Sequence, residues 1–321
     1  MFTEVNLDTT KLHWSQITTS KLNRCFGLLG QVQDELLKTN RRNRVLLEII
    51  SELDELMPLR VRDNRLDDFH TLKERTSVYQ SLRAAETFNY LLRSIEMGDE
   101  DIFTCSGAKI YRSLNCELNR IGYTDETYKL LQDSMFTHGS THNGFSLNLR
   151  EAFSVKKEGE MEKYYPFSKL QRKMLWHSGH PVESLTKLKN GVQAPIQSAP
   201  STSYLFGKGI YFSDVVSKAA VNSFTNRVDS QCLLLLCDVA VGEEHKLLKP
   251  KLFQKAPKFH HSVVGIGKQA PANFKLLDGA RLPYGEVADN SVLMNSLQVK
   301  ESSFAYNEYV VYDQGQVRMA Y

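Results

Sequence analysis

The chain has 321 residues, of which 41% are hydrophobic and 24% are charged, so it can bury the cores of two ordinary domains and is not a disordered polymer. Its net charge of only +3 is smaller than is usual for a dedicated nucleic-acid-binding domain. No apolar run approaches the roughly 20 residues of a membrane span, and the first residues lack the layout of a signal peptide. Five cysteines without paired spacing indicate reduced thiols and no zinc site. We therefore expect an intracellular protein that does not associate with a membrane.

The first half, residues 1–150, is predicted to be all-helical because its apolar side chains recur at steps of three and four. The two clearest stripes are Leu46, Ile49, Ile50, Leu53, Leu56 and Met57, and Val78, Leu82, Ala85, Phe88, Leu92 and Ile95. A further helix is expected to begin at Thr124 and Asp125, whose side chains can cap a helix start. Glycine is sparse in this half, which favours helices throughout.

The second half, residues 151–321, is predicted to be rich in β-strands. The apolar run 232–241 ends at Gly242, as expected of a strand that is buried on both faces. The run 309–312 has the composition of a second strand, and residues 317–321 alternate with period two. The fold class is therefore expected to be α+β, with an all-helical domain followed by a mixed, mainly antiparallel β domain.

Three segments of the second half carry residue types that bind and react with ligands. They are 175–180 (LWHSGH), 204–218 (YLFGKGIYFSDVVSK) and 306–313 (YNEYVVYD). Together they resemble the His–Tyr–Glu signature of poly(ADP-ribose) polymerases, in the family's order and at similar separations. Residues 141–167 also resemble the family's junction between its helical regulatory domain and its catalytic domain, so the resemblance covers nearly the whole chain.

The resemblance implies that this chain transfers ADP-ribose from NAD, its substrate, to protein acceptors and releases nicotinamide without a metal. Nicotinamide leaves as a neutral molecule, so the reaction needs stabilisation of a cationic ribose rather than a general acid. By resemblance, Glu308 polarises the reacting ribose, His177 contacts the adenosine ribose, and Tyr211 lies against the nicotinamide ring. Tyr204 is expected in the same NAD site. A glutamate at position 308 further implies elongation of poly(ADP-ribose).

The sequence departs from the family in the pocket expected for NAD. Ser178 and Gly179 stand where most relatives have glycine and then serine, and Ala219 replaces a serine that donates to the carboxamide. Asn222 replaces a second ring-stacking tyrosine, and Gln193 replaces an arginine near the adenosine end. Each missing hydrogen bond or aromatic stack is expected to weaken NAD binding by about 0.5–1.5 kcal/mol.

Taken singly, each signature residue also has an ordinary structural explanation. His177 could be a satisfied core residue, Tyr211 could pack within a strand, and Glu308 could occupy a solvated edge position. The joint match favours the transferase. The altered pocket favours an alternative, a degenerate member that binds NAD, ADP-ribose or a protein without turnover. A purely structural protein is the third hypothesis, and it predicts no heat stabilisation by NAD.

Two other apparent motifs are given structural interpretations. The run 265–270 (GIGKQA) approximates a dinucleotide-binding fingerprint, but no βαβ pattern surrounds it and the required helix is missing. The family resemblance places this run in a loop near the acceptor side. His260 and His261 lack further ligands at metal spacing.

The resemblance also implies partners and a location. Protein acceptors, including the chain itself, are the expected partners, and DNA would be contacted only through modules that are absent from this chain. The helical domain is expected to restrict NAD entry until a partner domain signals, which is regulation by local opening. Nuclear localisation and a role in the DNA damage response follow by resemblance, with the cytoplasm as the alternative.

Overall fold

The structure is a computed structural model in which the chain divides into two compact units. It describes residues 8, 10–13, 16–38, 42–59, 66–68, 71–72, 74–76, 78–80, 82–83, 85–86, 106–138, 145–179, 181–195, 204–221, 223, 231–296 and 301–321. The first unit comprises residues 1–102 and 195–205, and the second comprises residues 103–194 and 206–321. No helix within the described ranges is long and apolar enough to cross a membrane.

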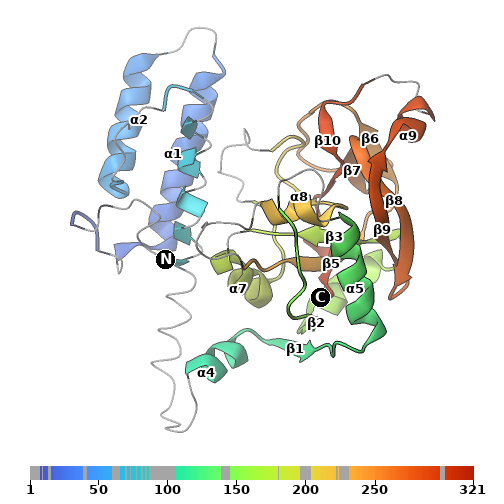
Figure 1. Cartoon of the computed structure of the whole chain (residues 1–321). Helices are drawn as coiled ribbons and strands as arrows, with labels where there is room; N and C mark the ends of the chain where they lie inside the picture. Colours follow the sequence, from blue (N-terminus) through green and yellow to red (C-terminus); the bar gives the residue numbers. More distant parts are fainter. Residues whose placement is uncertain are drawn as a thin grey trace. The chain divides into compact units, whose positions relative to one another are not determined.

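The first unit is built on two helices, α1 (Thr19–Leu36) and α2 (Asn43–Leu56), which lie side by side (Figure 1). The first predicted stripe is confirmed, because Leu46, Ile49, Leu53 and Met57 are buried and Ile50 and Leu56 pack against the same core. In the second stripe, Leu82 and Ala85 are buried and Val78 packs against the core, whereas Phe88, Leu92 and Ile95 lie outside the described residues.

The second unit contains the β-sheets and the helices from α4 to α9. The helices are α4 (Ser106–Ser113), α5 (Glu126–His138), α6 (Glu160–Tyr164), α7 (Pro181–Asn190), α8 (Val216–Val221) and α9 (Ser291–Ser296), with 3-10 turns at Tyr165–Phe167 and Gln314–Gln316. The strands are β1 (Cys116–Arg120), β2 (Phe153–Lys157), β3 (Arg172–His177), β4 (Ile210–Phe212), β5 (Leu235–Ala240), β6 (Glu244–Leu247), β7 (Ser262–Gly265), β8 (Gly267–Leu277), β9 (Ala280–Asp289), β10 (Phe304–Tyr306), β11 (Glu308–Val311) and β12 (Val317–Met319).

These strands form three sheets in which most neighbours are antiparallel. The sheet orders are β1-β2, β10-β8-β9-β3-β5-β12 and β4-β11-β7-β6, and the pairs β10–β8, β3–β9 and β6–β7 are parallel. The α+β class with a mixed, mainly antiparallel β domain is therefore confirmed. The predicted buried strand is β5, in which every residue from Leu235 to Ala240 is buried.

The segment 103–150 belongs to the second unit, so the boundary expected at residue 150 lies inside that unit. The expected helix is α5, whose first turn is capped by Asp125 Oδ1 accepting from Thr127 N at 2.7 Å. The prediction that residues 1–150 contain only helices is wrong, because strand β1 lies in this range and pairs with β2. Cys116 of β1 is buried and Leu118 packs against the same core, but an alternation of only two apolar residues is too short to indicate a strand by itself.

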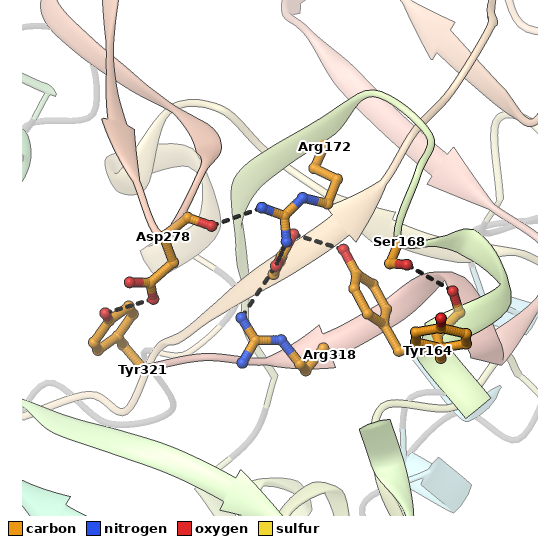
Figure 2. A network of polar contacts seen from close by, with 8 residues as sticks. Tyr164, Ser168, Arg172, Asp278, Arg318 and Tyr321 are labelled. Carbon is orange, nitrogen blue, oxygen red and sulfur yellow. Dashed lines mark hydrogen bonds and ion pairs between the residues drawn. The ribbon is translucent and has the colours of Figure 1, made fainter. Parts of the chain in front are cut away.

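A buried carboxylate joins three strands of the six-stranded sheet. Asp238 of β5, the strand between β3 and the edge strand β12, is fully buried. It accepts from Arg172 of β3 at 2.9 Å, Arg318 of β12 at 3.1 Å and Tyr164 at 2.7 Å. Figure 2 shows the two arginines and the tyrosine converging, while Arg172 continues to the carbonyl of Asp278 at 2.6 Å. A buried charge is tolerated only when it is paired and hydrogen-bonded in this way.

Replacing Asp238 with alanine should destabilise the protein strongly, because both arginines and the Tyr164 hydroxyl lose their shared acceptor. We expect the free energy of unfolding, measured by denaturant titration, to fall by about 3–5 kcal/mol. Glu151→Ala, which breaks the exposed Arg120–Glu151 ion pair of 2.7 Å, is the control and should cost less than about 1 kcal/mol. Equal destabilisation of the two variants would contradict a special role for the buried carboxylate.

Candidate active site

Two of the three sequence motifs meet where strand β3 runs beside the residue that follows β4. Trp176 N donates to Ser213 O at 2.8 Å, and Ser213 N donates to Trp176 O at 2.9 Å. This isolated bridge holds the end of the six-stranded sheet against the four-stranded sheet. As a result, the segment that contains His177 lies against the segment that contains Tyr211.

His177 ends β3 with one ring nitrogen engaged and the other without a partner. Its Nδ1 lies 2.8 Å from the carbonyl oxygen of Tyr211, so Nδ1 carries the proton and donates, and its ring packs on Phe212 with centroids 5.3 Å apart. Nε2 is buried and has no hydrogen-bond partner among the described residues. Burial, with the nearby Lys187 ammonium, lowers the pKa of His177 to about 3. The neutral ring therefore presents Nε2 as an acceptor that fits a ligand hydroxyl.

The lowered pKa of His177 predicts a pH dependence of stability. Below the ordinary value of 6.5 the unfolded chain binds a proton that the folded chain does not, so the free energy of unfolding falls as the pH falls from 6.5 towards 3. The shift corresponds to about 1–2 kcal/mol lost between roughly pH 6.5 and 5. Thermal or denaturant unfolding of the wild type and His177→Gln across this range should show the loss in the wild type only.

The comparison with His177→Gln is needed because a second group acts in the opposite direction. Burial raises the pKa of Glu160 to about 7, so its carboxyl makes the folded state less stable as the pH rises from 4.5 towards 7. Glu160 is present in both proteins and its effect cancels in the difference. Parallel pH profiles for the two proteins would contradict the buried neutral state of His177.

The hydroxyl of Tyr211 is tied to the turn that precedes its own strand. It accepts from Phe206 N at 2.9 Å and donates to Gly207 O at 2.8 Å. The ring packs against a cluster of buried side chains that includes Phe206 and Val310. Gly207 has φ +87°, and a Cβ there would lie 1.9 Å from the carbonyl oxygen of Phe253, so only glycine fits the turn. The aromatic ring is thus held rigidly at the start of the four-stranded sheet.

Glu308 begins β11, the strand that pairs with β4. Tyr211 lies opposite Val310, so Glu308, two residues earlier on the same strand, projects from the same face as Tyr211. Such diagonal neighbours are separated by roughly 7–8 Å. The carboxylate Oε1 lies 2.8 Å from Lys218 Nζ, and this ammonium also donates to Asn307 O at 2.9 Å. Lys218 therefore fixes the position of Glu308 and stabilises its negative charge.

Helix α8 connects the glutamate to the histidine. Lys218, which pairs with Glu308, is followed by Ala219, whose carbonyl accepts a short hydrogen bond from the hydroxyl of Ser178. Ser178 in turn follows His177 in the chain. A continuous series of contacts thus runs from Glu308 through α8 to His177, and all three sequence motifs contribute to one site.

The residues on either side of Glu308 are anchored to one buried carboxylate. Asp214 Oδ2 accepts from Asn307 Nδ2 at 2.6 Å and from the Tyr309 hydroxyl at 3.2 Å. Asn307 Oδ1 accepts from Gly267 N at 2.8 Å. Burial raises the pKa of Asp214, and these hydrogen bonds oppose that effect. The backbone that carries Glu308 is therefore clamped on both sides.

The position of Gly179 is explained by an ion pair on helix α7. A Cβ on Gly179 would lie 2.3 Å from Lys187 Nζ and 2.4 Å from Glu183 Oε2. Lys187 pairs with Glu183 at 3.4 Å and donates to the carbonyl oxygen of Ser178 at 3.1 Å, and burial lowers the pKa of Lys187. A serine at position 179, which the family resemblance leads us to expect, would require this pair to move. The lysine also competes with any ligand for the Ser178 carbonyl.

The remaining candidates are not brought to this group of residues by any described contact. Gln193 donates to Asn190 O at 3.4 Å, at the end of its own preceding helix. Tyr204 belongs to the first compact unit, where its hydroxyl accepts from Gln80 at 3.1 Å. Asn222 lies outside the described residues. The assignment of these three residues to an NAD site stays a prediction.

The glycine-rich run 265–270 joins two strands rather than forming the loop that the resemblance implies. Gly265 ends β7 opposite Glu308, and Gly267 begins β8. A Cβ on Gly267 would lie 2.2 Å from the backbone of Tyr306, and one on Gly265 would lie 2.6 Å from the ring of Phe206. Both glycines are needed because the backbone of the Glu308 motif and the ring of Phe206 pass very close to them.

Sequence reasoning missed several residues that position the site. They are Glu183, Lys187, Asp214, Lys218 and Asn307. Asp214, Lys218 and Asn307 fall inside the recognised motifs, so their neighbourhood in the sequence was a usable signal. Glu183 and Lys187 are spaced four apart on a helix, which predicts an ion pair but not its contact with residues 178–179. Among the described residues, no group of three or more His, Cys, Asp or Glu side chains could hold a metal ion.

Comparison with known proteins defines the class. The family model for the poly(ADP-ribose) polymerase catalytic domain matches residues 124–321. Poly [ADP-ribose] polymerase 1 of Danio rerio is 29% identical over 326 residues, which cover 99% of this chain and 31% of the relative. The enzyme of the same name from Gallus gallus is 30% identical over 99% of this chain and 31% of the relative.

Poly [ADP-ribose] polymerase 2 of Homo sapiens is 28% identical over 328 residues, which cover all of this chain and 54% of the relative. The chain thus spans about a third of the matched polymerase 1 proteins and about half of this polymerase 2. This chain belongs to the poly(ADP-ribose) polymerase family.

Proposed function

We propose that this chain transfers ADP-ribose from NAD to protein acceptors, with release of nicotinamide, and that it elongates poly(ADP-ribose). The observation that carries the proposal is the series of contacts from Glu308 through Lys218, Ala219 and Ser178 to His177, which gathers three separate motifs into one site. Family membership supports the same chemistry. The name of the matched relatives supports polymer formation by those proteins.

Each residue has a chemical role in this proposal. His177 Nε2 accepts a hydrogen bond from a ribose hydroxyl of the donor, which satisfies a buried atom that otherwise has no partner among the described residues. The rigid ring of Tyr211 lies against the flat nicotinamide cation, a contact worth roughly 0.5–2 kcal/mol. Glu308, held by Lys218, stabilises positive charge on the reacting ribose.

The bond changes balance without an additional reagent. The glycosidic bond between the ribose and nicotinamide breaks, and its electron pair leaves with neutral nicotinamide. A side-chain nucleophile of the acceptor then bonds to the same ribose carbon, and its proton is taken up by Glu308 or solvent. For elongation, Glu308 polarises a ribose hydroxyl of the growing chain in place of the protein side chain.

A binding module without turnover is the second candidate, and one specific observation favours it. The ion pair of Lys187 and Glu183 fills the space beside Gly179, and Lys187 occupies the Ser178 carbonyl, where the family resemblance expects carboxamide recognition. In contrast, the hydroxyl of Ser178 donates to the backbone carbonyl of Ala219, so a hydroxyl is present beside the residue that replaces the serine expected by resemblance. This hydroxyl supports the transferase.

Incubation of the chain with labelled NAD distinguishes the candidates. High-molecular-weight labelled protein together with free nicotinamide would support the polymerase, and labelling by single units would support transfer without elongation. Heat stabilisation by NAD without nicotinamide release would favour the binding module. A protein that is neither labelled nor stabilised by NAD would overturn both proposals and leave a structural role.

The proposal extends to partners and location. Protein acceptors, including the chain itself, are the partners, and DNA is contacted only through modules that are absent from this chain. We propose nuclear localisation and a role in the DNA damage response, with restriction of NAD entry by the helical unit. Fractionation of cells that express the tagged protein tests the location, and a purely cytoplasmic signal would contradict it.

A further inference from the structure

A strongly basic segment comprises most of strand β6 and the loop that leads from β6 to β7. Residues 245–261 contain no aspartate or glutamate, and their lysines and histidines are Lys246, Lys249, Lys251, Lys255, Lys258, His245, His260 and His261. All five lysines are exposed, and none forms an ion pair with a carboxylate in the described ranges. Such a run of unpaired cations attracts a polyanion.

The basic segment starts beside the catalytic glutamate. Leu247, the last residue of β6, pairs with Gly265 of β7, and Gly265 pairs with Glu308 of β11. At the usual spacing of neighbouring strands, the backbones of Leu247 and Glu308 are about 10 Å apart. Ser303 N donates to Leu248 O at 2.9 Å, which holds the start of the segment at this edge. The lysines that follow therefore leave the sheet at the end where Glu308 lies.

The middle of the segment is fastened to the turn that holds Tyr211. Phe253 N donates to Phe206 O at 3.2 Å, and the carbonyl oxygen of Phe253 lies close to Gly207. The hydroxyl of Tyr211 contacts Phe206 and Gly207 of this turn. The basic segment is thus attached to the site at two points and is not a free surface loop.

An exposed aromatic side chain lies among these cations. The ring of Phe259 is 81% exposed, and Lys258 Nζ lies 4.9 Å from its centroid. Its backbone is in the left-handed region at φ 67°, which is uncommon for a bulky residue. Exposed aromatic rings within a basic surface are the usual stacking platforms for the bases of single-stranded polynucleotides.

Few acidic side chains oppose this charge. Glu244 on β6 is paired with Lys173 at 2.6 Å. Glu243, which is adjacent in the chain, and Glu301, two residues before the Ser303 that bonds to Leu248, are exposed. The two glutamates cannot neutralise five lysines, so the surface stays positive.

We infer that residues 246–259 form a binding surface for a chain of ADP-ribose units, which leads the polymer away from Glu308. The lysines contact its phosphates and Phe259 stacks on an adenine ring. The inference rests on the proposed function. Location favours this polymer over RNA, because the segment begins two strands from Glu308, where a growing chain is extended.

The test measures binding of ready-made poly(ADP-ribose) of defined length to the full chain by fluorescence anisotropy. The variant K249Q/K251Q/K255Q/K258Q should bind at least about tenfold more weakly at low salt, and the dependence of log affinity on log salt should decrease by about 0.7 for each phosphate that is no longer neutralised. The control K129Q/K156Q/K163Q/K169Q removes the same charge from exposed positions elsewhere in the second unit and should leave affinity almost unchanged. Circular dichroism and thermal unfolding should show that both variants fold.

A second pair of variants tests stacking. Phe259→Ala should weaken polymer binding about fivefold or more, whereas Phe136→Ala, which removes a ring that is 78% exposed on α5, should not. Equal affinities of the four-lysine variant and its control would overturn the inference. Tighter binding of single-stranded RNA of equal length would overturn the choice of polymer. Because the polymer is supplied, a chain that binds it without consuming NAD would contradict the proposed function while supporting this surface.

Discussion

Glu308→Gln is expected to abolish nearly all transfer of ADP-ribose while leaving the fold intact. The substitution keeps the size of the side chain and an oxygen that can accept from Lys218, which also remains bonded to Asn307 O. It removes the negative charge that we propose stabilises the cationic ribose. We expect nicotinamide release to fall on the order of 10²–10⁴-fold. Heat stabilisation by NAD should persist, because His177 and Tyr211 are unchanged.

The matched control for this experiment is Glu286→Gln, the same chemical change at an exposed position on β9. Its rate of nicotinamide release should equal that of the wild type. Retention of the wild-type rate in Glu308→Gln, to within a few-fold, would mean that the carboxylate takes no part in the chemical step. Loss of heat stabilisation in Glu308→Gln would mean that the residue acts in binding instead.

Asp214→Ala should impair both stability and transfer, although Asp214 is a positioning residue. Removing its carboxylate leaves Asn307 Nδ2 without its 2.6 Å acceptor and the Tyr309 hydroxyl without its 3.2 Å acceptor. Because buried polar groups are then unsatisfied, the free energy of unfolding should fall by about 2–4 kcal/mol. Glu308 lies between these two residues, so its displacement should lower kcat about 10–100-fold. Denaturant titration and steady-state kinetics measure the two effects.

Asp214→Asn provides a sharper control than a distant residue. Both hydrogen bonds reach the same oxygen, Oδ2, while Oδ1 has no partner among the described residues. An asparagine with its oxygen in the Oδ2 position keeps both bonds, so we expect most of the stability and kcat to return. If the stability and kcat of Asp214→Asn are as low as those of Asp214→Ala, the charge of Asp214 is required and its acceptor oxygen is not sufficient.

The sequence predicted the elements whose patterns are local. The stripe in α2, the cap at Asp125 and the buried strand β5 each depend on side chains that are close in the sequence. The strand β1 was missed for the same reason. Its pairing with β2 is made across more than thirty intervening residues, and its alternation is limited to two apolar residues, Cys116 and Leu118.

By itself the sequence determined the family, the α+β class and the three motifs, because these depend on residue types in a fixed order. The tertiary structure decided how the motifs work together. Ion pairs such as Lys218–Glu308 and the clamp of Asp214 on Asn307 join residues that are far apart in the chain. Such contacts depend on the register of β4, β7 and β11, which brings together residues that are distant in the chain and which no local sequence pattern specifies. The need for glycine at position 179 also became evident only in the tertiary structure, because Lys187 and Glu183 occupy the space that a side chain would need.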